Sequence, residues 1–223
     1  QVRTFHAAAL RQLRFFWPQL SRTAFPELMS SKASIVARSL AHCKVDSDKA
    51  LVRDVSGDIE WSKSNMMDSA LVHKAKRDFA IDVATLAKVM DSYESLKKDR
   101  NLLDFDDILM LMSAAIRTRP EIQSAVHSAY RWFTVDEFQD VNPLQKSVLD
   151  LWIGERDDIC VVGDPSQTIY SFTGASSKYL TNFVKAYPNS TLVDLVRCYR
   201  CSPEIVAMAN AVIHADSRTK PLT

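Results

Sequence analysis

Two acidic residues, Asp136 and Glu137, directly follow a short apolar run that ends at Val135. A buried parallel strand delivers side chains to the active edge of an open α/β sheet in this way. Neighbouring acids can divide the work of nucleotide hydrolysis, because one can hold Mg²⁺ while the other handles the attacking water. We predict that Asp136 holds Mg²⁺ and that Glu137 acts on water. The alternative is a salt-bridged acid pair at a strand end.

A second apolar run, from Ile159 to Val162, also ends in a carboxylate, that of Asp164. Parallel strands bring their carboxyl ends to one edge of a sheet, so the two strand ends should meet there. Gln167 follows on the next loop, and we expect its amide to lie beside Asp136 and Glu137. The three side chains should face a nucleotide site.

The residues around these strand ends alternate between strand and helix patterns. We predict strands over 131–135, 158–162 and 191–196, a helix opened by Asn142 and Pro143 and ended by Gly154, and a helix over 176–186. At the beginning of the chain we predict a strand over 2–5 and a helix over 7–16 that Pro18 stops. Alternation of this kind implies an α/β fold with a parallel sheet.

The stretch from 21 to 101 differs, because it contains no convincing strand. Apolar residues recur at helical spacing over 71–79 and 83–93, and a turn is expected over 54–58. We therefore predict a helical subdomain inserted into the α/β core.

A helix should begin after Asp104, which can cap it with the help of Asp107. We interpret Asp104, Asp106 and Asp107 as capping and solvated charges, since acids in a first turn favour the helix dipole.

A last helix begins at Ser202 and Pro203. Its apolar stripe comprises Ile205, Met208, Ala209, Val212 and Ile213. Because this stripe needs a partner surface, and because the chain opens inside a predicted strand, we expect a fragment of a larger protein.

The composition excludes several classes of protein. The 223 residues are 47% hydrophobic and 25% charged, with a net charge of +1, so no polybasic face is expected to bind duplex DNA by charge alone. Single-stranded nucleic acid stays possible, because its grooves also rely on stacking. There is no apolar run of about 18 residues and no signal-peptide pattern. We expect a cytoplasmic protein whose four cysteines are reduced.

A phosphate-binding P-loop, Gly-x-x-x-x-Gly-Lys-Ser/Thr, is absent from the sequence. Its four glycines are followed by Asp58, Glu155, Asp164 and Ala175. None of them precedes a lysine, so this chain alone should not hydrolyse ATP.

Five segments carry a family resemblance. They are Thr4-Phe5-His6-Ala7, Leu103-Asp104-Phe105-Asp106-Asp107-Ile108-Leu109, Asp136-Glu137-Phe138-Gln139-Asp140, the stretch from Gly163 to Ala175, and Tyr199-Arg200. In this order they resemble the superfamily 1A DNA helicases of the UvrD/Rep/PcrA type, with the third, fourth and fifth similar to motifs II, III and IV. The resemblance implies ATP and Mg²⁺ as cofactors, single-stranded DNA or DNA with single-strand tails as partner, and a nucleoid-associated protein of DNA repair or replication.

The resemblance also implies a fold and its division into domains. We expect an incomplete RecA-like P-loop NTPase sheet, called domain 1A, over 1–17 and 104–200. The helical insertion, 1B, is expected over 18–103, and the start of a second RecA-like domain, 2A, over 201–223.

Site residues follow from the same resemblance. Gln167 is similar to the sensor of the γ-phosphate, because an amide can bind both water and phosphate without carrying charge. Arg200 would meet the γ-phosphate from the far side of the cleft, and Tyr199 would stack on adenine. The ordinary alternatives are a surface salt bridge for Arg200 and simple packing for Tyr199.

DNA contacts are implied for two segments. Tyr170 and Phe172 would stack on bases, unless they fill the core instead. Thr4, Phe5 and His6 correspond to the early single-strand contact segment, although a lone histidine is often a packed or capping residue.

The chain departs from the family at two places. Thr173 stands where arginine is usual, which removes a charge near the DNA groove. Cys198 and Cys201 flank Tyr199-Arg200, and their spacing invites a zinc or redox interpretation, although zinc needs four ligands.

Three functions remain open at this point. The leading one is an ATP-driven translocase and helicase on single-stranded DNA, in which closure on ATP moves the stacked bases. The second is a non-catalytic DNA-binding or scaffold module of the same fold. The third is the helicase subunit of a helicase–nuclease.

Overall fold

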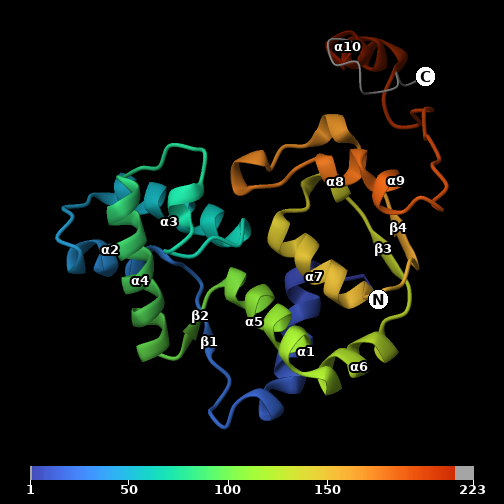
Figure 1. The fold of residues 1–223 in the computed structure, drawn as a ribbon. Helices are drawn as coiled ribbons and strands as arrows, with labels where there is room; N and C mark the ends of the chain where they lie inside the picture. The colour runs from blue at the N-terminus through green and yellow to red at the C-terminus, as the bar shows by residue number, and fades with distance from the viewer. Residues whose placement is uncertain (1, 214–223) are drawn as a thin grey trace. The chain divides into compact units, whose positions relative to one another are not determined.

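The computed structural model describes residues 2–213, drawn as a ribbon in Figure 1. The chain divides into two compact units. The first unit holds residues up to 133, together with 142–158 and 172–174. The second unit holds 134–141, 159–171 and the described residues from 175 onward. Helices dominate, and the strands are short and parallel, so the expected α/β class is confirmed at this level.

Four helices form one part of the first unit. They are α1 (Phe5–Leu20), α5 (Phe105–Thr118), α6 (Pro120–Ala129) and α7 (Pro143–Ile153). Helices α1 and α7 both pack on α5. The indole of Trp152 stacks on the ring of Phe5, with centroids 5.9 Å apart, and its Nε1–H donates to Gln12 Oε1 at 2.8 Å. Contacts of this kind fix α1 against α7.

The end of α7 follows the expected pattern. Gly154 caps the helix with φ 65°, a conformation that favours glycine, and donates its N–H to the carbonyl of Asp150. A Cβ there would lie 2.7 Å from the ring of His127. Both the backbone conformation and the space therefore require glycine.

The other part of the first unit is built from α2 (Ala33–His42), α3 (Lys49–Ser64), the short 3₁₀ helix η1 (Val72–Lys74) and α4 (Val83–Asp99). These elements share a hydrophobic core of Met29, Ile35, Val36, Leu40, Val55, Ile59, Val72, Leu86, Val89, Met90 and Tyr93. The predicted helical face over 83–93 is thereby confirmed.

One strand lies inside the stretch for which we predicted none. Strand β1 (Glu27–Leu28) pairs in parallel with β2 (Leu102–Leu103). Two residues are too few for the alternating pattern that marks a strand in a sequence. The pairing brings both ends of the helical segment together.

Two predictions within the helical stretch are wrong. Residues 54–58 are not a turn but part of α3, because Val55 and Ile59 are fully buried and their packing outweighs the cost of about 1 kcal/mol for Gly57 in a helix. Over 71–79 only η1 is helical. Tertiary packing decides both segments.

The N-terminal prediction is also wrong. Residues 2–4 form no strand, and α1 begins at Phe5 because the Oγ1 of Thr4 accepts the N–H of Ala7 and caps the helix. Pro18 does not stop α1, which runs on to Leu20. A proline so close to the end removes only one hydrogen bond from the final turn.

The second unit is built around strand β4 (Ile159–Val161) and strand β3 (Phe133–Val135), the first residue of which belongs to the first unit. It continues through the short helices η2 (Phe138–Asp140), η3 (Pro165–Gln167), α8 (Lys178–Thr181) and α9 (Phe183–Ala186), and includes α10 (Pro203–Ile213). A further 3₁₀ turn, η4 (Ser171–Thr173), follows η3, and its last two residues belong to the first unit. The ring of Phe138 is fully buried and meets Phe183 edge-on at 6.0 Å.

Three predictions for the second unit need correction. The strands β3 and β4 are shorter than predicted, and the helix over 176–186 is broken at Asn182 into α8 and α9. Residues 191–196 form no strand, and Leu192, Val193 and Leu195 are largely exposed. An apolar run becomes a strand only where a neighbour completes its hydrogen bonds.

Helix α10 begins at Pro203, as predicted. Ile205, Met208 and Val212, members of its predicted apolar stripe, are exposed. The side chain of Ile213 lies outside the described part of the structure.

The three acids at the start of α5 are not solvated as predicted. Asp106 does not cap the helix but is buried and pairs with Lys32. Asp104 and Asp107 form a reciprocal capping box, and both are buried together with Lys63 and Lys97. Lys63 Nζ donates to Asp104 Oδ2 at 2.7 Å and to Asp107 Oδ1 at 2.5 Å. Lys97 Nζ donates to Asp107 Oδ2 at 2.5 Å. We call these four residues the buried ion cluster.

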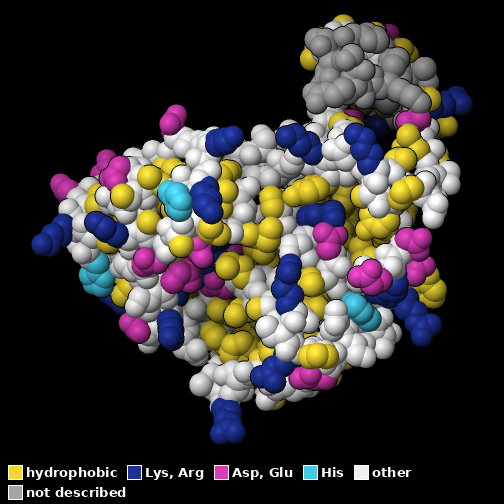
Figure 2. Space-filling view, viewed as in Figure 1, with side chains coloured by type: hydrophobic (Ala, Val, Ile, Leu, Met, Phe, Trp, Pro, Cys, Tyr) yellow, Lys and Arg dark blue, Asp and Glu magenta, His cyan; other side chains and the backbone are white. Residues whose placement is uncertain are grey.

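The surface carries no concentration of positive charge in the view of Figure 2, where Lys and Arg are scattered among acidic and apolar side chains. Within residues 2–213, no helix combines the length and apolar character needed to cross a membrane.

Candidate functional site

The predicted acids lie where strand β3 ends. Strands β3 and β4 are parallel, because the hydrogen bonds between them advance in the same direction along both strands. Phe133 N–H donates to Asp158 O at 3.0 Å, and Val162 N–H donates to Val135 O at 2.8 Å. Both strands therefore deliver their following residues to the same edge. Asp136 follows β3 at this edge, with its side chain exposed.

Glu137 has an unusual backbone. Its φ of 51° and ψ of 42° lie in the left-handed region, which a residue with a bulky side chain seldom adopts. The N–H of Glu137 donates to Asp136 Oδ1 at 3.0 Å, and the residue then caps η2. Strained backbone of this kind is typical of functional sites, where it gives a side chain an orientation that an unstrained backbone would not allow.

Gln139 is the residue that sequence reasoning missed. Only 1% of it is exposed, and both ends of its amide are bonded. Its Nε2 donates to Glu137 Oε2 at 2.6 Å, and its Oε1 accepts the N–H of Asp164 at 3.0 Å. The sequence did contain a signal for this role: Gln139 is a polar residue two positions after Glu137 and next to the apolar Phe138, and a buried polar side chain needs hydrogen-bond partners.

The loop after β4, residues 163–171, is called the sensor loop below. Asp164 organises its first turn, because its Oδ1 accepts the N–H of Ser166 at 2.9 Å and its Oδ2 accepts Nε2 of Gln167 at 2.8 Å. The structure thus brings the predicted Gln167 into one hydrogen-bonded network with Glu137, through Asp164 and Gln139.

Gly163 allows this loop to approach η2. A Cβ at this position would clash with Gln139 Oε1 and would lie 3.1 Å from the backbone nitrogen of Phe138. A further hydrogen bond joins this loop to η2, because Ile169 N–H donates to Asp140 Oδ1 at 3.3 Å. The residues after the two strands therefore form one bonded assembly.

The chemistry of these groups suits a hard cation and a water molecule. The carboxylate of Asp136 is exposed, and its Oδ1 accepts the N–H of Glu137; among residues 2–213 no hydrogen bond is made to Oδ2, which is thus available to a ligand. Mg²⁺ prefers one or two carboxylates and keeps several waters. The exposed side chain of Glu137 accepts a hydrogen bond from Gln139, which holds it in place.

The remaining predicted nucleotide contacts are exposed. Tyr199 is 85% exposed and lies under the guanidinium of Arg197 at 5.1 Å. No hydrogen bond or ion pair within residues 2–213 joins Arg200 to Asp136 or Glu137. Their contacts with a nucleotide stay predictions.

The predicted DNA contacts divide into exposed and packed residues. Tyr170 is 49% exposed and Phe172 is 70% exposed, so neither fills the core. Phe5 packs on Trp152, and the hydroxyl of Thr4 caps α1. Phe5 and Thr4 therefore have structural roles, and their contact with DNA stays a prediction.

His6 also has packing contacts. Its ring meets Phe105 edge-on at 5.9 Å. Burial lowers the pKa of His6 below its usual value, although the charge of Asp106 opposes this effect. Burial of the ring therefore favours the neutral imidazole over the charged one.

Cys198 and Cys201 do not form a metal site with other described residues. All four cysteines are free, and within residues 2–213 no third histidine, cysteine or carboxylate completes a cluster with this pair. The backbone N–H of Cys201 donates to Cys198 Sγ at 3.5 Å. Backbone hydrogen bonds from Cys201 and Arg200 lower the pKa of the Cys198 thiol.

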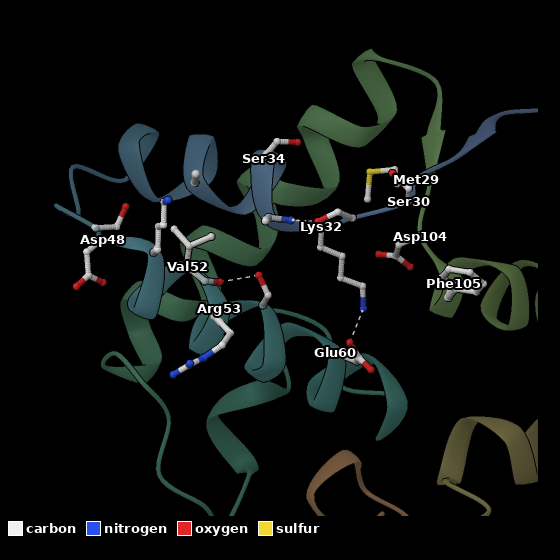
Figure 3. Close-up of a pocket in the computed structure, with 16 residues that line it drawn as sticks. Met29, Ser30, Lys32, Ser34, Asp48, Val52, Arg53, Glu60, Asp104 and Phe105 are labelled. Carbon is white, nitrogen blue, oxygen red and sulfur yellow. Dashed lines mark hydrogen bonds and ion pairs between the residues drawn. The ribbon is translucent and has the colours of Figure 1, made fainter.

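A cavity of about 870 Å³ lies in the first unit, between the start of α2 and helix α3 (Figure 3). Lys32 reaches across it to Glu60 at 3.3 Å, and also pairs with Asp106 at 2.8 Å. Because these charges neutralise one another, the cavity has no concentration of one sign for a charged ligand.

The sequence of this chain is similar to a family of known proteins. Residues 1–188 match the model of the UvrD/REP helicase N-terminal domain. The chain is 44% identical over 222 residues to a protein named ATP-dependent DNA helicase UvrD2 in Mycobacterium bovis, covering 96% of the chain and 32% of that protein. It is 30% identical over 222 residues to ATP-dependent DNA helicase PcrA of Leuconostoc citreum, covering 99% of the chain and 29% of that protein. The chain spans about a third of the length of the curated relatives it matches.

Proposed function

Since this chain belongs to the UvrD/REP helicase family through its N-terminal domain, we propose that it is part of an ATP-dependent helicase that moves on single-stranded DNA. The observation that carries the proposal is the hydrogen-bonded network at the ends of β3 and β4, which unites Glu137, Gln139, Asp164 and Gln167. We further propose that the protein acts at the nucleoid.

The proposed roles follow from the chemistry of each side chain. Asp136 would hold Mg²⁺ with its free oxygen, and the metal would neutralise charge on the phosphates. Glu137 would accept a proton from the attacking water. Gln167 would sense the γ-phosphate by leaving its bond to Asp164, while Arg200 and Tyr199 would contact the phosphate and the adenine after the domains close.

The proposed domain organisation keeps the boundaries predicted from the sequence. A RecA-like sheet would use 1–17 and 104–200, the helical insertion 18–103, and the opening of a second RecA-like domain 201–223. The pairing of β1 with β2 supports the insertion, because it brings the entry and the exit of the helical segment together.

The first test is the ATPase activity of the full-length protein that carries this chain. We expect hydrolysis of ATP that single-stranded DNA stimulates by at least about fivefold, since coupling free energies of 1–3 kcal/mol are typical. The 223-residue chain alone should show no turnover, because it contains no P-loop. A full-length protein that binds DNA but never hydrolyses ATP would favour a scaffold module instead.

A second test concerns the aromatic residues of motif III. Replacing both Tyr170 and Phe172 by alanine should weaken binding of single-stranded DNA, because each lost stacking contact costs about 1–3 kcal/mol. Fluorescence anisotropy with a labelled oligonucleotide measures the change. Phe15, which is also largely exposed, provides the control: Phe15→Ala should leave the affinity unchanged. Equal affinities for all three proteins would remove the stacking role.

A further inference from the structure

The bonds of Gln139 connect two segments that are predicted to do different jobs. One segment carries the water-activating Glu137, and the other is the sensor loop with Gln167 and the exposed Tyr170. Gln139 donates to Glu137 Oε2 at 2.6 Å and accepts from Asp164 N–H at 3.0 Å. The same side chain therefore fixes a reacting group and the start of the loop.

Burial makes the two hydrogen bonds of Gln139 costly to break. Gln139 is 1% exposed, and the neighbouring Phe138 and Val141 are also buried. An amide in such a place that loses one partner leaves a buried polar atom unsatisfied, which is costly. The side chain cannot release Glu137 or Asp164 without this cost, so displacement of one end is transmitted to the other.

We propose that Gln139 is a positioning residue that couples the sensor loop to Glu137, so that movement of this loop on DNA or nucleotide changes the aim of the water-activating carboxylate. The proposal rests on the proposed function. It assigns no contact between Gln139 and substrate. The strained backbone of Glu137 supports it, because a left-handed glutamate keeps its position only while its surroundings hold it.

Two variants of Gln139 separate the two halves of this connection. Gln139→Met has a similar length and removes both hydrogen bonds. Gln139→Glu keeps an oxygen for Asp164 N–H but places a carboxylate against Glu137, in surroundings that already contain Asp136, Asp140 and Asp164. The matched control is Gln12→Met, which removes another buried glutamine whose Oε1 accepts a hydrogen bond, from Trp152.

The kinetic test uses the full-length protein and compares kcat for ATP with and without single-stranded DNA. We expect both Gln139 variants to lower the DNA-stimulated kcat by about tenfold to a hundredfold, as for a misplaced catalytic group, with the KM for ATP within about twofold. The stimulation ratio should fall by at least about fivefold, the lower end of common coupling. Gln12→Met should keep the wild-type ratio even if it lowers the melting temperature.

Hydrogen exchange of residues 163–171 gives a readout that needs no activity. The amide of Asp164 should exchange at least about tenfold faster in Gln139→Met, whereas Gln139→Glu should keep its protection, because only the latter retains the acceptor. Wild-type stimulation ratios in both variants, or unchanged exchange in Gln139→Met, would overturn the coupling role. A wild-type protein without stimulated ATPase activity would overturn the proposed function instead, and the exchange experiment would still decide whether Gln139 holds the loop.

Discussion

Glu137→Gln in the full-length protein should lower the kcat for DNA-stimulated ATP hydrolysis by about 10²–10⁴-fold, the usual contribution of a general base. The amide cannot accept a proton from water at neutral pH, although it has nearly the same shape. Its oxygen can still accept the hydrogen bond from Gln139 Nε2, so the assembly at the strand ends should remain. The affinity for ATP should stay within about twofold, because a lost transition-state interaction changes kcat rather than ground-state binding.

Steady-state kinetics and equilibrium binding of a fluorescent ATP analogue measure the two quantities. Glu155→Gln is a suitable control, because Glu155 is an exposed glutamate on the loop after α7. This variant should have wild-type kcat and affinity. Turnover by Glu137→Gln at the wild-type rate would show that another group activates the water.

The positions of the strand ends could be predicted from the sequence because they depend on local patterns. An apolar run followed by an acid marks both β3 and β4, and a capping asparagine with proline marks the start of α7. The network between the strand ends could not be predicted in the same way. Gln139 and Asp164 are 25 residues apart, and their hydrogen bond exists only after β3 and β4 pair.

The errors have a related cause, because they arise where tertiary contacts override local preference. Gly57 resembles a turn residue, yet the burial of Val55 and Ile59 keeps it inside α3. Leu192 and its apolar neighbours resemble a strand, yet residues 191–196 do not form one in the described structure. The same limit applies to Asp104 and Asp107, whose capping role is local but whose burial depends on lysines of α3 and α4.

The buried ion cluster predicts the largest effect on stability. Lys63 donates to Asp104 and Asp107, and also to Glu94 at 3.1 Å. Burial by itself would raise the pKa of Asp104, but the charges of Lys63 and Lys97 outweigh it and hold the pKa below its usual value. Burial would lower the pKa of Lys63, but the charges of Asp104 and Asp107 outweigh it and raise the pKa. The charges therefore stabilise one another only as a set.

Lys63→Met should lower the free energy of unfolding by about 3–5 kcal/mol, because Lys97 alone then neutralises two buried carboxylates and one buried negative charge is left uncompensated. Urea denaturation followed by circular dichroism measures the loss. The double variant Lys63→Met/Asp104→Asn should recover part of it, since one positive and one negative charge are removed together. Lys146→Met is the matched control: the Lys146–Asp150 pair is more exposed, and its loss should cost less than about 1 kcal/mol.

The dependence on pH distinguishes this charge effect from a simple loss of packing. The folded pKa of Asp104 is lowered, so its contribution is complete above the unfolded pKa of about 4 and is lost as the pH falls through the lower folded value. The folded pKa of Lys63 is raised, so its contribution is complete below about pH 10 and is lost as the pH rises through the higher folded value. The difference in stability between wild type and Lys63→Met should therefore be largest between these limits and shrink in acid. A difference that stays constant down to about pH 2 would show that packing by the lysine side chain, rather than its charge, stabilises the first unit.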